Sequence, residues 1–184
     1  MLLVYTGDGK GKTSACVGQA IRAAGQGLPV AFVQFMKSDV QAGEQKMLAA
    51  LTGITLHIGG CGFFLNEENR ALHRDAALRT LEWATRHLDG LFMMLLDEVL
   101  YALQLGLLER RELENFLVQG KQKQVHLVLS GRALPSWLED MADLVTEMRE
   151  IKHPWRSGKG VSNDLWQRPT FPHDVMQYHR RWRA

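Results

Sequence analysis

Residues 4–13 are Val4-Tyr5-Thr6-Gly7-Asp8-Gly9-Lys10-Gly11-Lys12-Thr13, an apolar strand that runs into a glycine-rich turn carrying lysines. Backbone N–H groups from Gly7 to Lys12 can curl around an anion, the Lys12 ammonium can reach phosphates, and the Thr13 hydroxyl can ligate Mg²⁺. The pattern predicts a P-loop that binds a nucleoside triphosphate. The alternative is a glycine-rich turn with incidental lysines. The common loop has glycine at the position of Thr6, so this is a threonine-led variant.

Length and composition favour one globular domain. The chain has 184 residues, 46% of them hydrophobic, and a formal net charge of +2, which is too mild to indicate a nucleic-acid partner. Its two cysteines, Cys16 and Cys61, and the lack of a secretory signal predict a cytoplasmic protein. The longest apolar run, residues 91–96, is far shorter than the roughly 18 residues that cross a bilayer, so no membrane segment is expected.

Apolar runs alternate with helical patterns along the chain, which is typical of an α/β domain with a mostly parallel sheet covered by helices. We expect a P-loop domain over residues 1–153 and an irregular tail, rich in tryptophan and arginine, over residues 154–184. Gly27 and Gly120 occupy positions typical of glycines that end helices. The expected strands, about six, are residues 2–5, 30–36, 54–58, 92–97, 126–130 and 144–151. The expected helices are residues 13–26, 42–51, 67–88, 110–119 and 135–141.

Two acids follow the apolar run at residues 93–96. Carboxylates at the carboxyl end of a strand can face bound phosphates, so Asp97 or Glu98 is expected to hold Mg²⁺, directly or through water, opposite Thr13. One of the two acids can instead cap the next helix. Beyond a later strand, the Arg132 guanidinium is placed to contact phosphate or substrate, and the alternative is a surface salt bridge.

An aromatic segment follows the third expected strand. Residues 59–64 are Gly59-Gly60-Cys61-Gly62-Phe63-Phe64, at the edge where α/β sheets bind ligands. Exposed aromatic rings there indicate a planar or bulky ligand, and the alternative is that both rings fill the core. The chain lacks HExxH, paired cysteines and a G-x-S-x-G elbow, which disfavours zinc and serine hydrolysis.

Several blocks, in one order from about residue 3 to about residue 161, are similar to the P-loop family of ATP:corrinoid adenosyltransferases. This resemblance implies a RecA-like sheet, a homodimer, and transfer of the 5′-deoxyadenosyl group of ATP to the Co(I) of a corrinoid, with release of triphosphate. The blocks are residues 6–13, Val33-Gln34-Phe35-Met36-Lys37, Gly43-Glu44, Gly62-Phe63, Asn69-Arg70, Leu96-Asp97-Glu98, Ser130-Gly131-Arg132 and Ile151-Lys152-His153.

The resemblance also implies roles for particular residues. Lys12 and Glu98 are expected to be catalytic, and Mg²⁺ is expected at Thr13, Asp97 and Glu98. Phe63, with Phe64 and Leu65, is expected to crowd the lower face of the corrin so that Co(II) is more easily reduced. The ATP-binding set comprises Thr6, Gly7, Asp8, Gly9, Lys10, Gly11, Lys12, Thr13, Ser14, Arg22 and Arg132.

The chain differs from those relatives at two places. They carry tryptophan where this chain has Leu65, and they have a segment before the first strand that covers the nucleotide, so we expect the tail to close the site instead. A reductase such as a flavoprotein is the expected further partner. The alternative functions are a small P-loop kinase, which would yield ADP rather than triphosphate, and a RecA-like ATP-binding regulatory or nucleic-acid module, which would bind DNA in a salt-dependent way.

Overall fold

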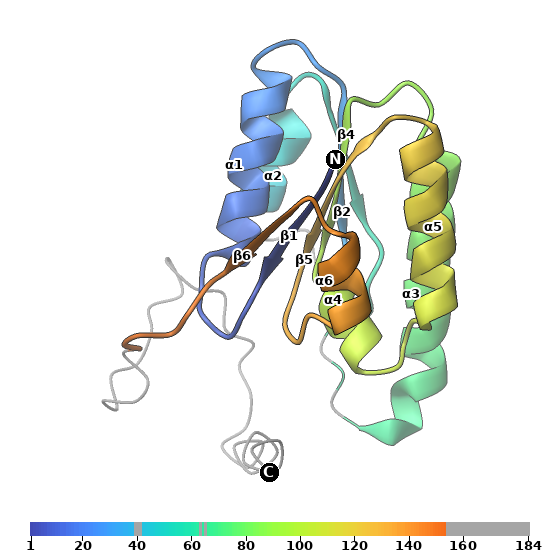
Figure 1. Ribbon diagram of the computed structural model, residues 1–184. Helices are drawn as coiled ribbons and strands as arrows, with labels where there is room; N and C mark the ends of the chain where they lie inside the picture. The colour runs from blue at the N-terminus through green and yellow to red at the C-terminus, as the bar shows by residue number, and fades with distance from the viewer. Residues whose placement is uncertain (39–41, 63, 65, 154–184) are drawn as a thin grey trace. The chain divides into compact units, whose positions relative to one another are not determined.

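Six parallel strands form one sheet in the order β3-β2-β4-β5-β1-β6, as the alternating apolar pattern predicts. Parallel neighbours need crossover connections, and helices supply most of them (Figure 1). The computed structural model describes residues 1–38, 42–62, 64 and 66–153, of which Met1–Glu150 form one compact unit. The strands are β1 Leu2–Thr6, β2 Val30–Gln34, β3 Ile54–Ile58, β4 Met93–Asp97, β5 His126–Ser130 and β6 Leu144–Glu147.

The helices cover both faces of the sheet, with α1 and α2 on one side and α3 and α5 on the other (Figure 1). In the described part of the chain, no helix is long and apolar enough to cross a membrane. The arrangement is the single α/β domain of a RecA-like P-loop fold. The helices are α1 Lys12–Ala24, α2 Gly43–Ala50, α3 Arg70–Arg86, α4 Val99–Gln104, α5 Arg110–Gln122 and α6 Ser136–Met141.

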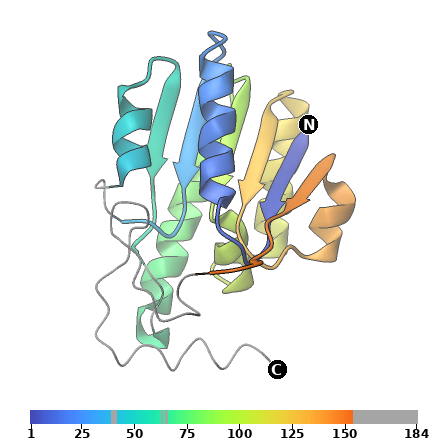
Figure 2. The ribbon, with the colours of Figure 1, turned by 90° about the vertical axis from the view of Figure 1, so that its left-hand side faces the viewer.

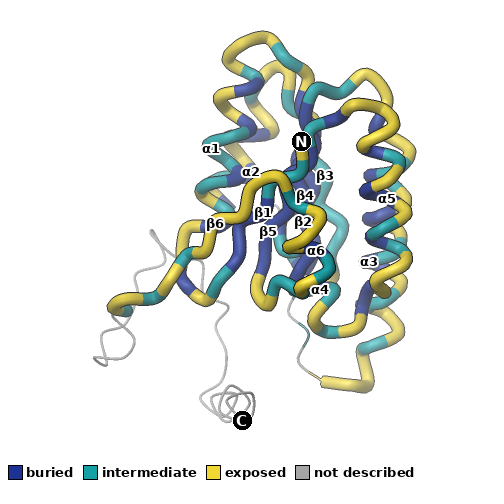
Figure 3. Tube along the Cα trace, viewed as in Figure 1, coloured by how far each residue is buried: buried dark blue, intermediate teal, exposed yellow. Residues whose placement is uncertain are grey.

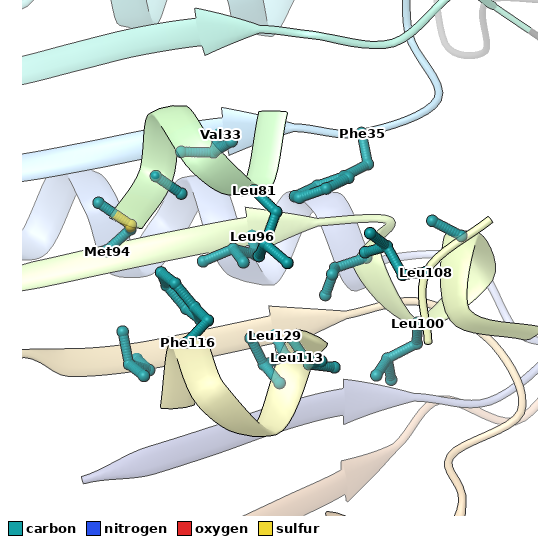
Figure 4. Close-up of a cluster of buried hydrophobic side chains, with 14 of the residues drawn as sticks. Val33, Phe35, Leu81, Met94, Leu96, Leu100, Leu108, Leu113, Phe116 and Leu129 are labelled. Carbon is teal, nitrogen blue, oxygen red and sulfur yellow. The ribbon is translucent and has the colours of Figure 1, made fainter. Parts of the chain in front are cut away.

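The central strands β2 and β4 are buried along their whole length and apolar up to their last residue, because both of their faces are covered (Figure 2). In β4, Met93 and Leu95 pack in the cluster that includes α1, whereas Met94 and Leu96 pack in the cluster that includes α3 and α5. Figure 4 shows the second cluster, in which Phe116 of α5 faces the sheet. Two separate hydrophobic layers therefore hold the edge of the sheet that carries the predicted acids.

The expected strands and helices are all present, with several different boundaries. Strand β2 ends at Gln34 rather than at residue 36, because Met36 has a left-handed backbone with φ 59°. Strand β6 ends at Glu147. The long helix expected from residue 67 begins as a 3₁₀ turn, Glu67–Asn69, before α3. Helix α4 was not expected, because its six residues follow the acid pair directly and merge with an apolar run.

The two glycines expected to end helices differ in outcome. Gly27 lies just beyond α1 with φ 73°, as expected. The expectation for Gly120 is wrong, because Gly120 is a buried residue inside α5. A Cβ at Gly120 would lie 2.6 Å from Cδ1 of Leu127, so the glycine lets α5 pack closely against β5. The cause is packing across elements, which the local sequence does not reveal.

Candidate active site

The carboxyl ends of the central strands carry unusual backbone conformations. Four described non-glycine residues have positive φ, and three of them, Met36, Glu98 and Ala133, follow β2, β4 and β5. Such conformations are costly for residues with a Cβ and persist where the surroundings impose them, often at functional sites. Strands β4 and β5 are buried almost throughout (Figure 3), and the chain becomes exposed at Arg132, just beyond β5. This edge of the sheet is therefore the place to look for a site.

The P-loop connects β1 to α1 at this edge, as predicted. Gly7 and Gly11 adopt φ 100° and 111°, which glycine tolerates because it has no Cβ. The backbone after β6 lies directly against the loop: a Cβ on Gly7 would lie 2.5 Å from the Met148 carbonyl oxygen, and the Gly9 N–H donates to that oxygen at 2.7 Å. The glycines of the motif thus allow a second backbone segment to support the loop.

The Lys12 side chain is buried inside the loop. Its Nζ donates hydrogen bonds to the carbonyl oxygens of Gly7, at 2.7 Å, and Gly9, at 2.8 Å. Burial lowers the pKa of Lys12, and the Glu98 carboxylate opposes that effect. The ammonium is held by neutral acceptors, which phosphate oxygens can replace with stronger, charge-assisted hydrogen bonds.

Asp97 is fully buried and accepts hydrogen bonds from three side chains. The Ser130 hydroxyl donates to its Oδ1 at 2.6 Å, and the Thr13 hydroxyl lies 3.1 and 3.2 Å from its two oxygens. The Gln34 amide donates to Oδ2 at 3.3 Å. The P-loop, β2, β4 and β5 therefore meet at one carboxylate, which confirms that Thr13 and Asp97 lie together.

Glu98 is half-buried and has φ 62°. Its backbone N–H donates to the Ser130 hydroxyl at 3.1 Å. Burial and the Asp97 carboxylate raise the pKa of Glu98, and the charges of Lys12 and Arg132 partly oppose them. Glu98 occupies the position before α4, yet its side chain makes no capping hydrogen bond, so the capping alternative is not supported for this acid.

The donor set fits a magnesium ion. Hydroxyl and carboxylate oxygens of Thr13, Asp97 and Glu98 are the hard ligands that Mg²⁺ takes, usually with phosphates and waters. In the part of the chain that the structure describes, no cluster of three histidine, cysteine or acidic residues forms a closed metal cage. An ion shared between two carboxylates and a nucleotide is the arrangement these residues can provide.

The structure brings some of the other predicted residues to the loop and leaves one away from it. Arg132 lies at the mouth, with Nη1 3.9 Å from Asp8 Oδ1. Both side chains are exposed, so this weak surface pair leaves the guanidinium available to a ligand. Thr6 is buried at the end of β1, whereas Lys10 and Ser14 are exposed.

Arg22 is the predicted ATP-binding residue that lies away from the loop. It belongs to the last turn of α1, ten residues beyond Lys12, which is about 15 Å along the helix axis.

The aromatic segment rests on the turn that follows β2. A Cβ on Gly60 would lie 2.4 Å from the Met36 backbone nitrogen, so the two backbones touch. The Phe64 ring packs edge-to-face on His73, with centroids 5.4 Å apart, and the Arg70 guanidinium lies 5.1 Å from its centroid. Phe64 is half-buried against the hydrophobic core, which agrees with the core alternative for this ring. The predicted corrinoid contacts Phe63 and Leu65 lie outside the described residues.

Two polar residues near the acids were not predicted as part of the site. Gln34 and Gln45 are almost fully buried and hydrogen-bonded to each other at 2.7 Å. In the sequence, Gln34 is marked only as the single polar residue at the end of the apolar run Val30–Val33. It also lies in residues 33–37, which are similar to the family, but no role was assigned to it there. Its partner Gln45 lies on a different element, and no local pattern joins the two.

Comparison with known proteins agrees with this geometry. The family model for ATP:corrinoid adenosyltransferase BtuR/CobO/CobP matches residues 1–163. A corrinoid adenosyltransferase of Sinorhizobium sp is 37% identical over 164 residues, covering 86% of this chain and 76% of that protein. Those of Escherichia coli K12 and Salmonella typhimurium LT2 are 33% and 32% identical over 160 residues, each covering 86% of this chain and 81% of the relative. The comparisons favour neither the kinase nor the regulatory module, and the chain belongs to the family of ATP:corrinoid adenosyltransferases.

Proposed function

We propose that this protein transfers the 5′-deoxyadenosyl group of ATP to the Co(I) of a corrinoid and releases triphosphate. The observation that carries the proposal is the meeting of the P-loop hydroxyl of Thr13 with the buried Asp97 and Ser130, in a chain whose residues 1–163 match the family model. A loop that binds phosphates and an adjacent pair of acids suit a reaction in which a whole triphosphate departs.

The reaction needs no covalent intermediate with the protein. The electron pair on Co(I) attacks C5′, a cobalt–carbon bond forms, and the bond between C5′ and the triphosphate oxygen breaks with its electrons leaving on the triphosphate. Because the nucleophile is already reactive, no side chain has to remove a proton. The protein contributes by positioning the two substrates and stabilising the leaving group.

Different residues around the P-loop are proposed to bind different parts of the triphosphate and its metal ion. Lys12 and Arg132 supply positive charge, and the loop supplies backbone N–H donors. Thr13, Asp97 and Glu98 would hold Mg²⁺, which neutralises developing negative charge on the phosphates when it is bound. Lys12 must exchange its hydrogen bonds to the loop carbonyls for phosphate oxygens. Thr6 to Lys10, Ser14 and Arg22 remain proposed contacts of the nucleotide.

The corrinoid is proposed to bind beside the aromatic segment. Phe63 and Leu65 are the proposed contacts with the lower face of the corrin, and Phe64 is proposed to support them. The structure supplies a basis for that support: Phe64 is anchored between His73 and Arg70 at the start of α3. A ring held in this way can fix the segment from which its neighbours extend.

The partners and the location of the enzyme are also proposals. Co(I) has to be generated by one-electron reduction, so a reductase such as a flavoprotein is the expected electron source. A homodimer and a cytoplasmic location are proposed from the family resemblance and from cysteine usage.

An anaerobic assay with Mg-ATP and chemically reduced cob(I)alamin tests the reaction. The expected products are adenosylcobalamin, followed by its absorbance, and an equal amount of triphosphate. ADP as the product would favour a kinase, and salt-dependent DNA binding would favour the RecA-like module. ATP binding without any cobalt–carbon product, using cob(I)alamin and corrinoid biosynthetic precursors, would contradict the proposed function.

A further inference from the structure

A line of buried amides leads from the backbone at the start of α2 to Asp97. The Ala42 N–H donates to Gln45 Oε1 at 3.1 Å, Gln45 Nε2 donates to Gln34 Oε1 at 2.7 Å, and Gln34 Nε2 donates to Asp97 Oδ2 at 3.3 Å. A backbone N–H can only donate, so it sets the direction of every amide after it. The Gln34 N–H group is therefore forced to point at the carboxylate.

This arrangement is costly unless it serves a purpose. Gln34 and Gln45 are 0% and 1% exposed, and burying a primary amide is unfavourable unless its hydrogen bonds are made. Every buried side-chain polar atom in the described ranges has a partner, so the line is complete. Apolar side chains of similar size would fill the same space without needing such a line. What they could not provide is a donor at Asp97 Oδ2.

The two oxygens of Asp97 are held from opposite directions. Ser130 donates to Oδ1 from β5, and Gln34 donates to Oδ2 from β2, with Thr13 between them. Gln34 and Asp97 are paired residues of the adjacent strands β2 and β4. The amide is neutral, so it orients the carboxylate and leaves its negative charge available to a cation.

We propose that Gln34 is a positioning residue of this enzyme: held by Gln45, it fixes the Asp97 carboxylate in the orientation that receives Mg²⁺ beside Thr13. The inference rests on the proposed function, since it concerns the magnesium site assigned there. The Gln34 side chain also hydrogen-bonds the Glu44 carboxylate, and the proposed positioning role is the one exerted through its bond to Asp97.

The test measures ATP binding by calorimetry over a series of Mg²⁺ concentrations. Gln34→Leu is expected to raise about tenfold the Mg²⁺ concentration at which ATP affinity is half-way to its magnesium-saturated value, because one hydrogen bond to a charged group is lost. ATP binding without metal should be unchanged. Gln45→Leu should shift it in the same direction by less, since Gln34 can then rotate. Gln19→Leu is the matched control: its amide bonds the Tyr5 hydroxyl at 2.8 Å, away from Asp97, and should leave the midpoint unchanged.

The double variant Gln34→Leu with Gln45→Leu separates positioning from packing. Replacing both partners of a buried hydrogen bond by apolar groups can be nearly neutral for that pair, although here the buried Ala42 N–H also loses its acceptor. The double variant should thus be about as stable to urea as Gln34→Leu and still need about tenfold more Mg²⁺. The inference about Gln34 would be overturned, with the proposed function left standing, if a folded Gln34→Leu protein needed no more Mg²⁺ than wild type to tighten ATP binding. It would also be overturned if the double variant returned to the wild-type Mg²⁺ requirement. A wild-type protein whose ATP affinity ignores Mg²⁺ would overturn the proposed metal site as well.

Discussion

Replacing Gly60 by alanine should damage corrinoid chemistry while sparing ATP binding. The new Cβ would lie 2.4 Å from the Met36 nitrogen and 2.5 Å from the Lys37 nitrogen, whereas ordinary contacts begin at 3.4 Å. These are backbone atoms that cannot rotate away, so the aromatic segment must rise from the turn by about 1 Å. Gly60 itself is outside the left-handed φ range, so the effect is steric and not one of backbone strain.

The size of the effect follows from that displacement. Overpacking of this kind costs about 1–3 kcal/mol of stability, and misplacing a substrate by about 1 Å can slow a reaction about 100-fold. We expect Gly60→Ala to lower the rate of adenosyl transfer by roughly that factor. ATP affinity should stay close to wild type, because the clash lies in the turn after β2 and not in the P-loop.

The assay compares transfer from cob(I)alamin, calorimetric ATP binding and urea unfolding in two variants. Gly18→Ala is the control, since its Cβ would meet nothing within 4 Å. It should be more stable by about 0.5–1 kcal/mol, the usual gain in a helix interior, and transfer at the wild-type rate. Wild-type transfer by a folded Gly60→Ala protein would refute the argument that the aromatic segment is set by this contact.

Three further predictions concern the loop, the aromatic segment and stability. Lys12→Ala should abolish transfer and leave the circular dichroism spectrum unchanged, because it removes the main phosphate charge, whereas Lys46→Ala on α2 should be neutral; near-normal turnover without Lys12 would contradict the assigned role. Phe63→Ala should slow reactions that start from Co(II) more than those that start from prereduced Co(I), and equal losses would remove its role in ligand displacement. Glu112→Gln should lose about 1 kcal/mol at pH 7, because Arg74 binds both Glu112 oxygens at 2.6 Å and lowers the pKa of that carboxyl. Since the folded pKa is depressed, this contribution is present above the ordinary value of 4.5 and is lost as the pH falls through the folded pKa; a difference in urea stability that persists in acid would contradict it.

Chemistry carried by contiguous residues could be predicted from the sequence. The P-loop and the acid pair are short motifs whose spacing alone brings their atoms to one strand end, and the structure places Thr13 beside Asp97. Gln34 and Gln45 could not be assigned, because their roles come from pairing between β2 and β4 and from a helix that begins elsewhere. The role of Met148 was hidden for the same reason: its carbonyl meets Gly9 only after β6 has paired with β1.

The relative positions of the polar side chains around Asp97 are set by strand register. Gln34 is paired with Asp97 across β2 and β4, Leu96 is paired with Leu129 across β4 and β5, and Ser130 therefore lies next to Asp97. A slip of one residue in either pairing would turn a polar side chain into the opposite hydrophobic layer, and burial on both faces makes that slip very unfavourable. The packing of two apolar layers thus fixes the carboxylate to which the loop, the amide and the hydroxyl converge. Substitutions in the interior of β4 that disturb its pairing should consequently displace Asp97 and weaken the effect of Mg²⁺ on ATP binding. The conformation of the P-loop should change less.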